Sequence, residues 1–375
     1  MNETTSPEQQ WAQWKEAWEA AAWHFTYMDE DQKDKAVLQG GLVAIFYFID
    51  AAQPRKRRAL AEIMLKFHEQ YGPHLKWGTF GEPVKAQPYS AGKFMECVGY
   101  VTQEDIDNSV EFTWSSGDGF DFVGSYQIGG FSDAGWSENV HQGTSYLRIH
   151  LPVVTLEGGR RSRFMDWMVE SAALLQPVNG YAGLGFQRSY EGDRYEHLEF
   201  EHAGDFKGLD VGSPLGLDEV RDGIKSINWL TFLSNAMLPP LGGKAGLQAR
   251  MAEVNRLLRV QAENEGKEGA GQNVAFSEQL TLHPYEGGVM VQAGEWPQLG
   301  WVDREPYPPA YVAANYLLRP ARVSDIGGLH YGSVAGEVRF DKHTSNVWLR
   351  RFDGAEPSVL GLEPAASGDR PVTKD

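Results

Sequence analysis

Residues 42–49 read LVAIFYFI, an unbroken apolar run in which β-branched and aromatic side chains dominate. A run of this length and composition is typical of a strand that is buried on both faces. The apolar residues that follow recur at helical spacing until a Gly-Pro pair ends the pattern: Leu60, Met64, Phe67 and Tyr71. We therefore predict a strand, then an amphipathic helix that ends near residue 71.

Alternating patterns further along predict strands with one buried face. They are Val110, Phe112 and Trp114, and then Leu147, Ile149 and Leu151. A helix is expected over residues 160–175 and another strand over residues 181–186, which repeats the order strand, helix, strand. No phosphate-binding glycine motif stands at the turns from strand to helix. The pattern favours an α+β fold with a mixed, largely antiparallel sheet covered by helices, arranged in one or two similar lobes.

The chain begins with a predicted helix over residues 7–28. Ser6-Pro7-Glu8 supplies an N-cap, a proline in the first turn and a negative charge near the helix start. A stripe of apolar residues follows at helical spacing: Trp11, Trp14, Trp18, Ala22 and Phe25. A stripe with this spacing usually packs on the core, although a face that binds a partner would have the same pattern.

The second half predicts helices over residues 229–237 and 308–318, and around Leu247 to Leu258. Strands are expected over 287–294 and 346–352. The polar stretch 261–273 is interpreted as a mobile loop. The predicted organisation is an N-terminal helix at 1–34, an α+β domain at 35–325 whose two lobes would join near 150–205, a strand region at 326–353 and a disordered tail at 354–375.

The composition limits the functional classes. With 34 basic against 51 acidic residues the chain carries a net charge of −17, which disfavours binding to duplex nucleic acid or to an anionic membrane surface. A neutral or basic partner is expected instead. The single cysteine cannot form an internal disulfide, and the apolar run at 41–49 is about half the length of a membrane-spanning helix. These features indicate a cytoplasmic protein.

Candidate chemistry in the sequence is weak. His197 and His202 in HLEFEH are five residues apart, which on a helix turns them about 140° away from each other and disfavours a shared metal ion. Cys97 follows Phe94 and Met95 in an apolar stretch and is expected in the core. No Gly-x-Ser-x-Gly motif occurs. We expect no catalytic residues, no metal and no cofactor.

Acidic side chains gather in short segments, at residues 29–31, 104–107 and 191–201. Such segments are usually solvated. The total charge nevertheless creates a field that attracts a basic surface and speeds the encounter with it.

The region 204–322 resembles a family of bacterial type VI secretion immunity proteins that accompany nuclease effectors of the VRR-NUC type. The resemblance rests on ordered segments: HAGDFKGLDVGSPLG at 202–216, IKSINWLTFL at 224–233, LGG at 241–243, GGVMVQAGEWPQLG at 287–300 and YPPAYVAANYLLRPAR at 307–322. FMDWMVESAALLQP at 164–177 and GYAGLGF at 180–186 are also similar to that family. The polar loop at 261–273 and the glycine-rich stretch at 327–336 are longer than the family pattern.

The resemblance implies an immunity protein that binds and neutralises a cognate DNase, either by occupying its DNA-binding or active site or by blocking a conformational step. An acidic inhibitor would occupy a groove that otherwise accepts phosphates. The candidate contact residues are two tyrosines as apolar anchors and the acidic residues near them: Tyr190, Tyr195, Glu191, Asp193, Glu196 and Glu199, with Asp118 and Asp121 of SSGDGFDF as a second group.

Two other functions remain open. The chain could be a hydrolase that uses carboxylates in its glycine-rich loops, which requires carboxylate pairs with shifted pKa values in a concave pocket. It could also be an adaptor or chaperone that loads an effector through the tryptophan-rich N-terminal helix. A homodimer is compatible with each of these functions.

Overall fold

The computed structural model describes residues 6–81, 85–103, 107–190, 192–266, 279–304, 307–330 and 338–362. The strands are β1 (Tyr27–Met28), β2 (Ala36–Phe48), β3 (Trp77–Phe80), β4 (Ala86–Pro88), β5 (Val110–Ser115), β6 (Gln127–Ser132), β7 (Ser145–Leu151), β8 (Asn179–Arg188), β9 (Leu230–Ser234), β10 (Leu280–Tyr285) and β11 (Gly288–Ala293). The helices of this α+β fold are α1 (Pro7–Ala22), α2 (Pro54–Tyr71), α3 (Ala91–Val101), α4 (Gly135–His141), α5 (Arg160–Leu175), α6 (Glu196–Ala203), α7 (Gly243–Gly266), α8 (Pro309–Leu318), α9 (Lys342–Leu349) and α10 (Glu356–Leu360).

All eleven of these strands belong to one sheet with the order β10-β11-β9-β8-β2-β7-β6-β5-β3-β4, and β1 pairs with β2 beside this path. The pairs between the strands are antiparallel, as the sequence favoured. β2 contains the apolar run at 42–49 except its last residue, and it lies between β7 and β8. Through β2 the sheet continues without a break across the junction predicted near 150–205.

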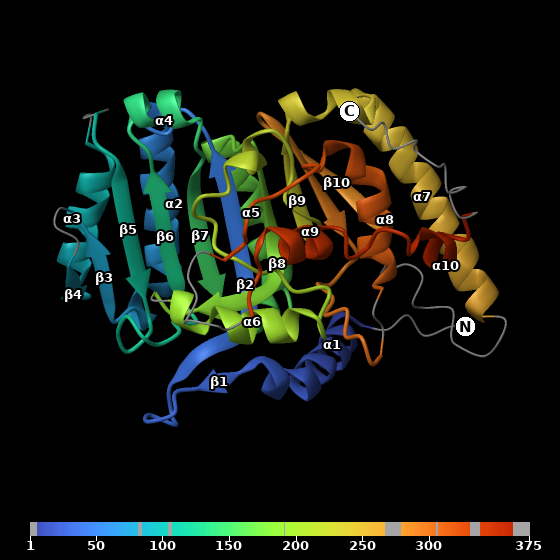
Figure 1. Ribbon diagram of the computed structural model, residues 1–375, viewed down its shortest axis with the longest axis horizontal. Helices are drawn as coiled ribbons and strands as arrows, with labels where there is room; N and C mark the ends of the chain where they lie inside the picture. Colours follow the sequence, from blue (N-terminus) through green and yellow to red (C-terminus); the bar gives the residue numbers. More distant parts are fainter. Residues whose placement is uncertain are drawn as a thin grey trace, which may run out of the picture.

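Both faces of the central strands are covered, which explains why β2 is apolar on both sides (Figure 1). Helices α2 and α5 lie behind the sheet, and α6 and α9 lie in front of it (Figure 1). On α2 the buried residues Leu60, Met64 and Phe67 confirm the predicted helical face. Cys97 of α3 is fully buried beside this layer, and burial raises the pKa of its thiol to about 12. The thiol is therefore a protonated core group.

Helix α1 confirms the predicted N-terminal helix over residues 7–22, whereas the rest of the predicted range forms a short 3-10 helix (Trp23–Phe25) and strand β1. Its start is a capping box in which the Ser6 hydroxyl accepts from the Gln9 N–H and the Gln9 side chain accepts from the Ser6 N–H. Trp11 and Trp18 are buried, and the Trp14 indole donates to the Pro297 carbonyl at 2.6 Å. The tryptophan stripe thus packs against the core.

Two of the predicted elements are wrong. Residues 229–237 form β9 and a short 3-10 helix instead of an α-helix, because this segment completes the sheet between β8 and β11, with Phe232 opposite both Gly180 and Met290. The expected last strand at 346–352 is instead helix α9, which begins where the Asp341 carboxylate accepts from the Thr344 N–H at 2.8 Å.

Several other segments differ from the sequence analysis or extend it. Strand β10 and helix α4 were not predicted. Helix α7 continues to residue 266, into the stretch interpreted as a loop, and the remainder of that loop lies outside the described residues. Helix α10 forms inside the expected tail, of which residues 363–375 also lie outside the described residues.

Charged side chains are buried between the sheet and the segments that cover its front. The Glu199 carboxylate of α6 lies 2.5 Å from Nε2 of His330 and 3.5 Å from the Arg188 guanidinium of β8, and it accepts from the Gly212 N–H at 3.1 Å. Burial alone would raise the pKa of Glu199, but Arg188, His330 and Gly212 together hold it below its usual value. Glu199 therefore joins α6 to the sheet and to the C-terminal region.

A second buried pair lies close by. The Lys225 ammonium is 2.9 Å from the Asp210 carboxylate, and it also donates to the Tyr181 hydroxyl at 3.0 Å and to the Val211 carbonyl at 2.5 Å. The Arg351 guanidinium stacks on Trp348 at 3.8 Å. Burial lowers the pKa of Arg351 to about 9.

We expect Lys225→Ala to lower the free energy of unfolding by about 3–5 kcal/mol, because it leaves the Asp210 carboxylate buried without its ammonium partner. Urea unfolding followed by circular dichroism measures this loss. The double variant Asp210→Asn/Lys225→Met removes both charges and should recover part of it. Lys342→Ala breaks an exposed pair with Asp325 and serves as the control, with little change in midpoint. If the Lys225→Ala protein is as stable as this control, Lys225 does not compensate a buried charge on Asp210.

Candidate functional site

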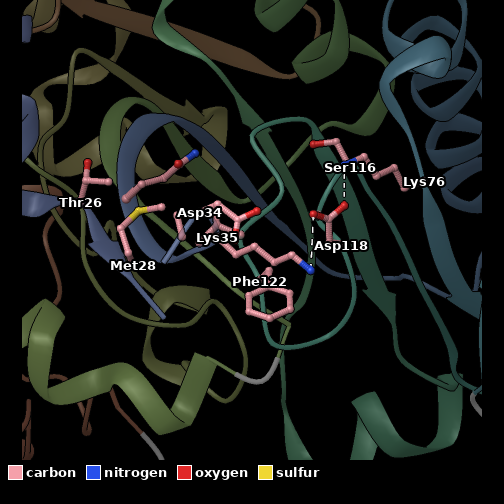
Figure 2. A pocket seen from close by; sticks show the side chains of 12 residues that line it. Thr26, Met28, Asp34, Lys35, Lys76, Ser116, Asp118 and Phe122 are labelled. Carbon is pink, nitrogen blue, oxygen red and sulfur yellow. Dashed lines mark hydrogen bonds and ion pairs between the residues drawn. The ribbon is translucent and has the colours of Figure 1, made fainter. Parts of the chain in front are cut away.

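A cavity of about 340 Å³ opens between the β1–β2 hairpin and the loop at 116–123 that precedes β6. Met28, Lys35 and Gln39 line it from the hairpin, and Asp118 and Phe122 line it from the loop (Figure 2). The loop is also attached through its backbone, since the Val123 N–H donates to the Ala36 carbonyl at 2.7 Å. The cavity therefore lies between two segments that are distant in the sequence.

Asp118 holds the two sides of this cavity together. Figure 2 shows its carboxylate between Lys76 and Lys35, at 2.5 Å and 3.9 Å from their ammonium nitrogens. The hydrogen bond from Lys76 lowers the pKa of Asp118. The Lys35 ammonium also lies 4.7 Å from the centre of the Phe122 ring. Much of the Asp118 charge is thus compensated within the protein.

Tyr190 supports the same loop from an aromatic cluster. Its ring centre lies 4.9 Å from that of Phe120 and 6.0 Å from that of Trp77, and Phe120 and Trp77 lie 4.8 Å apart. The Tyr190 hydroxyl is 3.5 Å from the Glu111 carboxylate. Burial, and then Glu111, raises the pKa of Tyr190. Tyr190 therefore packs beneath the loop, with part of its surface exposed.

Tyr195 lies near charges of both signs, with the Arg194 guanidinium 5.5 Å from its ring centre. Burial raises the pKa of its phenol, and the carboxylates of Asp29, Asp121 and Glu30 raise it further against the opposing charge of Arg194. These three carboxylates come from the β1–β2 hairpin and the 116–123 loop, and Glu30 and Asp121 are exposed. We call Asp29, Glu30, Asp121 and Tyr195 the acidic rim.

The backbone holds part of the acidic rim in place. The Asp29 carboxylate accepts from the N–H groups of Asp31 and Gln32 at 3.0 and 2.8 Å, which fixes the hairpin turn. The Tyr195 ring is half-buried, and its buried hydroxyl has no hydrogen-bond partner within the described residues. The acidic rim thus combines a carboxylate fixed by the backbone, two exposed carboxylates and a half-buried aromatic ring.

The other residues predicted as contacts do not form part of the acidic rim. Glu196 and Glu199 are each only 1% exposed and face Arg188, so they do not belong to the surface of this conformation. Glu191 lies outside the described residues. Asp193 falls in the 3-10 helix η4 (Gly192–Tyr195), whose position is described while the Asp193 side chain is not.

The segment HLEFEH also turns inward. His202 bonds to the Tyr27 hydroxyl, and Glu199 takes part in the buried pair described above. Across the described ranges, no group of three or more His, Cys, Asp or Glu side chains is arranged to hold a metal ion. None of the helices in that part of the chain is long and apolar enough to cross a membrane.

We expect Tyr190→Leu to loosen the 116–123 loop, because the substitution removes the ring that packs on Phe120 and Trp77. Hydrogen–deuterium exchange of residues 116–123 should become faster, by about tenfold for a loss of about 1.4 kcal/mol. Tyr190→Phe keeps the ring and removes only the hydroxyl, so it should exchange like the parent protein. Equal acceleration in both variants would contradict the role of the ring.

Comparisons with known proteins place the chain among bacterial competition systems. The profile of the TsiV family, described as type VI immunity for VRR-NUC, matches residues 59–266 and 259–352. The Pseudomonas aeruginosa T6SS protein PA0821 has a similar structure, with a TM-score of 0.73, 25% sequence identity, and coverage of 95% of this chain and 97% of the other. Curated protein sequences gave no match. Because the profile covers most of the sequence, the chain belongs to the TsiV family of type VI immunity proteins for VRR-NUC effectors.

Proposed function

We propose that this immunity protein neutralises a nuclease effector of the VRR-NUC type by placing the acidic rim over the surface that the effector uses to bind DNA. The observation that carries the proposal is that Asp29 and Glu30 of the β1–β2 hairpin and Asp121 of the 116–123 loop all act electrostatically on Tyr195, although the two segments and Tyr195 are far apart in the sequence. An effector that cuts DNA would be met in the cytoplasm of the producing cell or of its sister cells.

Electrostatics favours this contact. A nuclease binds the phosphate backbone with basic side chains, so its groove attracts carboxylates held at fixed positions. The net charge of −17 adds a long-range attraction that raises the association rate. In this mechanism the carboxylates of the acidic rim take the place of phosphates, and the inhibitor needs no chemistry of its own.

Tyr195 would contribute to affinity mainly by slowing dissociation of the complex. Interface energy concentrates in aromatic and arginine side chains that become fully desolvated, while charges at the rim mainly affect association. Tyr195 is already half-buried in the free protein, so binding would remove little further side-chain conformational entropy.

Asp118 and Tyr190 have supporting roles in this proposal. Asp118 bonds to Lys76, and its lowered pKa suits a permanent ion pair better than the general acid of a hydrolase. Together with Tyr190 it fixes the loop that presents Asp121. The adaptor alternative depended on a displayed tryptophan stripe, whereas Trp11 and Trp18 pack inside the protein.

We expect the triple variant Asp29→Asn/Glu30→Gln/Asp121→Asn to associate with the effector about tenfold more slowly at low salt and to lose most of its salt dependence. Asn at position 29 keeps the oxygen that accepts from Asp31 and Gln32, so the hairpin turn should persist. Surface plasmon resonance over a range of salt concentrations measures both effects.

The matched control is Glu69→Gln/Asp166→Asn/Glu263→Gln, which removes the same number of negative charges from exposed positions on α2, α5 and α7. If both triple variants slow association equally, only the net charge matters and the acidic rim is not the contact surface.

We expect Tyr195→Ala to weaken the complex by about 2 kcal/mol or more, mainly through faster dissociation, because an anchor is lost. Tyr195→Phe keeps the ring and should retain most of the affinity. A DNA-cleavage assay with each variant in excess tests whether binding also inhibits. Growth of cells that express the effector provides the readout for immunity. Full protection by Tyr195→Ala at limiting expression would contradict the proposal.

A further inference from the structure

A second cavity, of about 410 Å³, lies between the end of α2 and the start of α5 and shares no residue with the acidic rim. The 3-10 helix η3 (Val153–Leu156) and Tyr126 complete its walls. The lining residues that matter below are Tyr71, Tyr126, Thr155, Arg160, Arg163 and Trp167. We call this cavity the α2–α5 groove. Its volume lies in the range of small-molecule sites.

The groove gathers positive charge in a strongly acidic protein. The N-cap of α5 is Gly159, which offers no side chain to the first-turn N–H groups, and no acidic residue stands in that turn. The turn carries arginines instead, although cations are unfavourable at a helix N-terminus. Arg160 pairs with Glu157, whereas Arg163 is exposed and has no hydrogen-bond or ion-pair partner within the described residues.

The positive charges of Arg160 and Arg163 affect the pKa values of the tyrosines in the groove. Burial raises the pKa of both Tyr71 and Tyr126, and the charge of Arg160 opposes the shift in each. Arg163 does the same for Tyr71, whose hydroxyl also bonds to Thr155. Both arginines are therefore within electrostatic reach of the aromatic wall.

Trp167 adds a buried hydrogen-bond donor to the wall of the groove. It is only 6% exposed, and it lines the groove. Its indole N–H is buried and has no acceptor within the described residues. A buried donor without an acceptor costs free energy, and a small side-chain movement toward the groove would let a ligand oxygen satisfy it.

The wall of the groove also contains aromatic rings. The ring centre of Tyr71 lies 5.4 Å from that of Tyr126 and 6.3 Å from that of Trp167. Tyr126 in turn stacks on His74 at 4.1 Å, with the ring planes 5° apart. A planar ring could extend this stack. An inorganic anion would leave the rings without a stacking partner, and an apolar molecule would leave Arg163 without an anionic partner.

We propose that the α2–α5 groove binds a nucleoside monophosphate. The phosphate lies against Arg160, Arg163 and the N-terminus of α5, and the base stacks on Tyr71 and Tyr126. Because the protein as a whole repels polyanions, a single nucleotide is favoured over a nucleic-acid strand. This site is separate from the acidic rim and does not depend on its role.

Isothermal titration calorimetry of the full chain with AMP, GMP, CMP and UMP tests the proposal, with adenosine and inorganic phosphate as the two partial ligands. At least one nucleotide should bind at least tenfold more tightly than either partial ligand. Arg163→Gln should weaken nucleotide binding by about tenfold, which corresponds to about 1.4 kcal/mol. Arg58→Gln removes an equally exposed charge from α2 and should bind like the parent.

Tyr126→Leu separates the two halves of the site, because it should weaken binding of the nucleotide and leave that of phosphate unchanged. Thermal unfolding of each variant shows whether it is folded, and Arg163 is exposed enough for its substitution to be tolerated. The proposal is overturned if no nucleotide binds at millimolar concentration, if phosphate binds as tightly as the nucleotide, or if Arg163→Gln and Arg58→Gln behave alike.

Discussion

Several charges buried against the front of the sheet are held in ion pairs, and the arrangement of the C-terminal half depends on these pairs. Glu199 is held by Arg188, His330 and the Gly212 N–H, and Lys225 is held by Asp210. Each pair joins a strand or the segment after α6 to another part of the chain. Because an unpaired buried charge is far less stable than a paired one, these contacts select one placement of the covering segments over others.

The strength of the local apolar pattern explains which elements were predictable from the sequence. β2, α1, α2 and α5 have strong periodicity or an unbroken apolar run, and each was found where the pattern indicated. β9 is short and almost entirely buried, so helix and strand cannot be distinguished without knowing its neighbours β8 and β11. Helix α9 is defined by its Asp341 cap and by packing of Trp348, and its short apolar pattern resembled a strand.

The candidate site was only partly predictable. Tyr195 and Asp121 were identified from local acidity and aromatic character, and both belong to the acidic rim. Glu199 looked like a surface carboxylate because its partners Arg188 and His330 are far away in the sequence. The approach of Asp29 and Glu30 to Tyr195 leaves no local signal, since it results from the position of the β1–β2 hairpin beside η4. Proximity of this kind requires the three-dimensional structure.

The burial of Cys97 has a practical consequence. It is the sole cysteine of the chain, and its thiol is enclosed and protonated at neutral pH, so thiol reagents should leave the native protein unmodified. A cysteine introduced on the surface would then be the single reactive position. The native sequence is therefore already suited to attaching one fluorophore or spin label, and distances to an effector could be followed without first removing a background thiol.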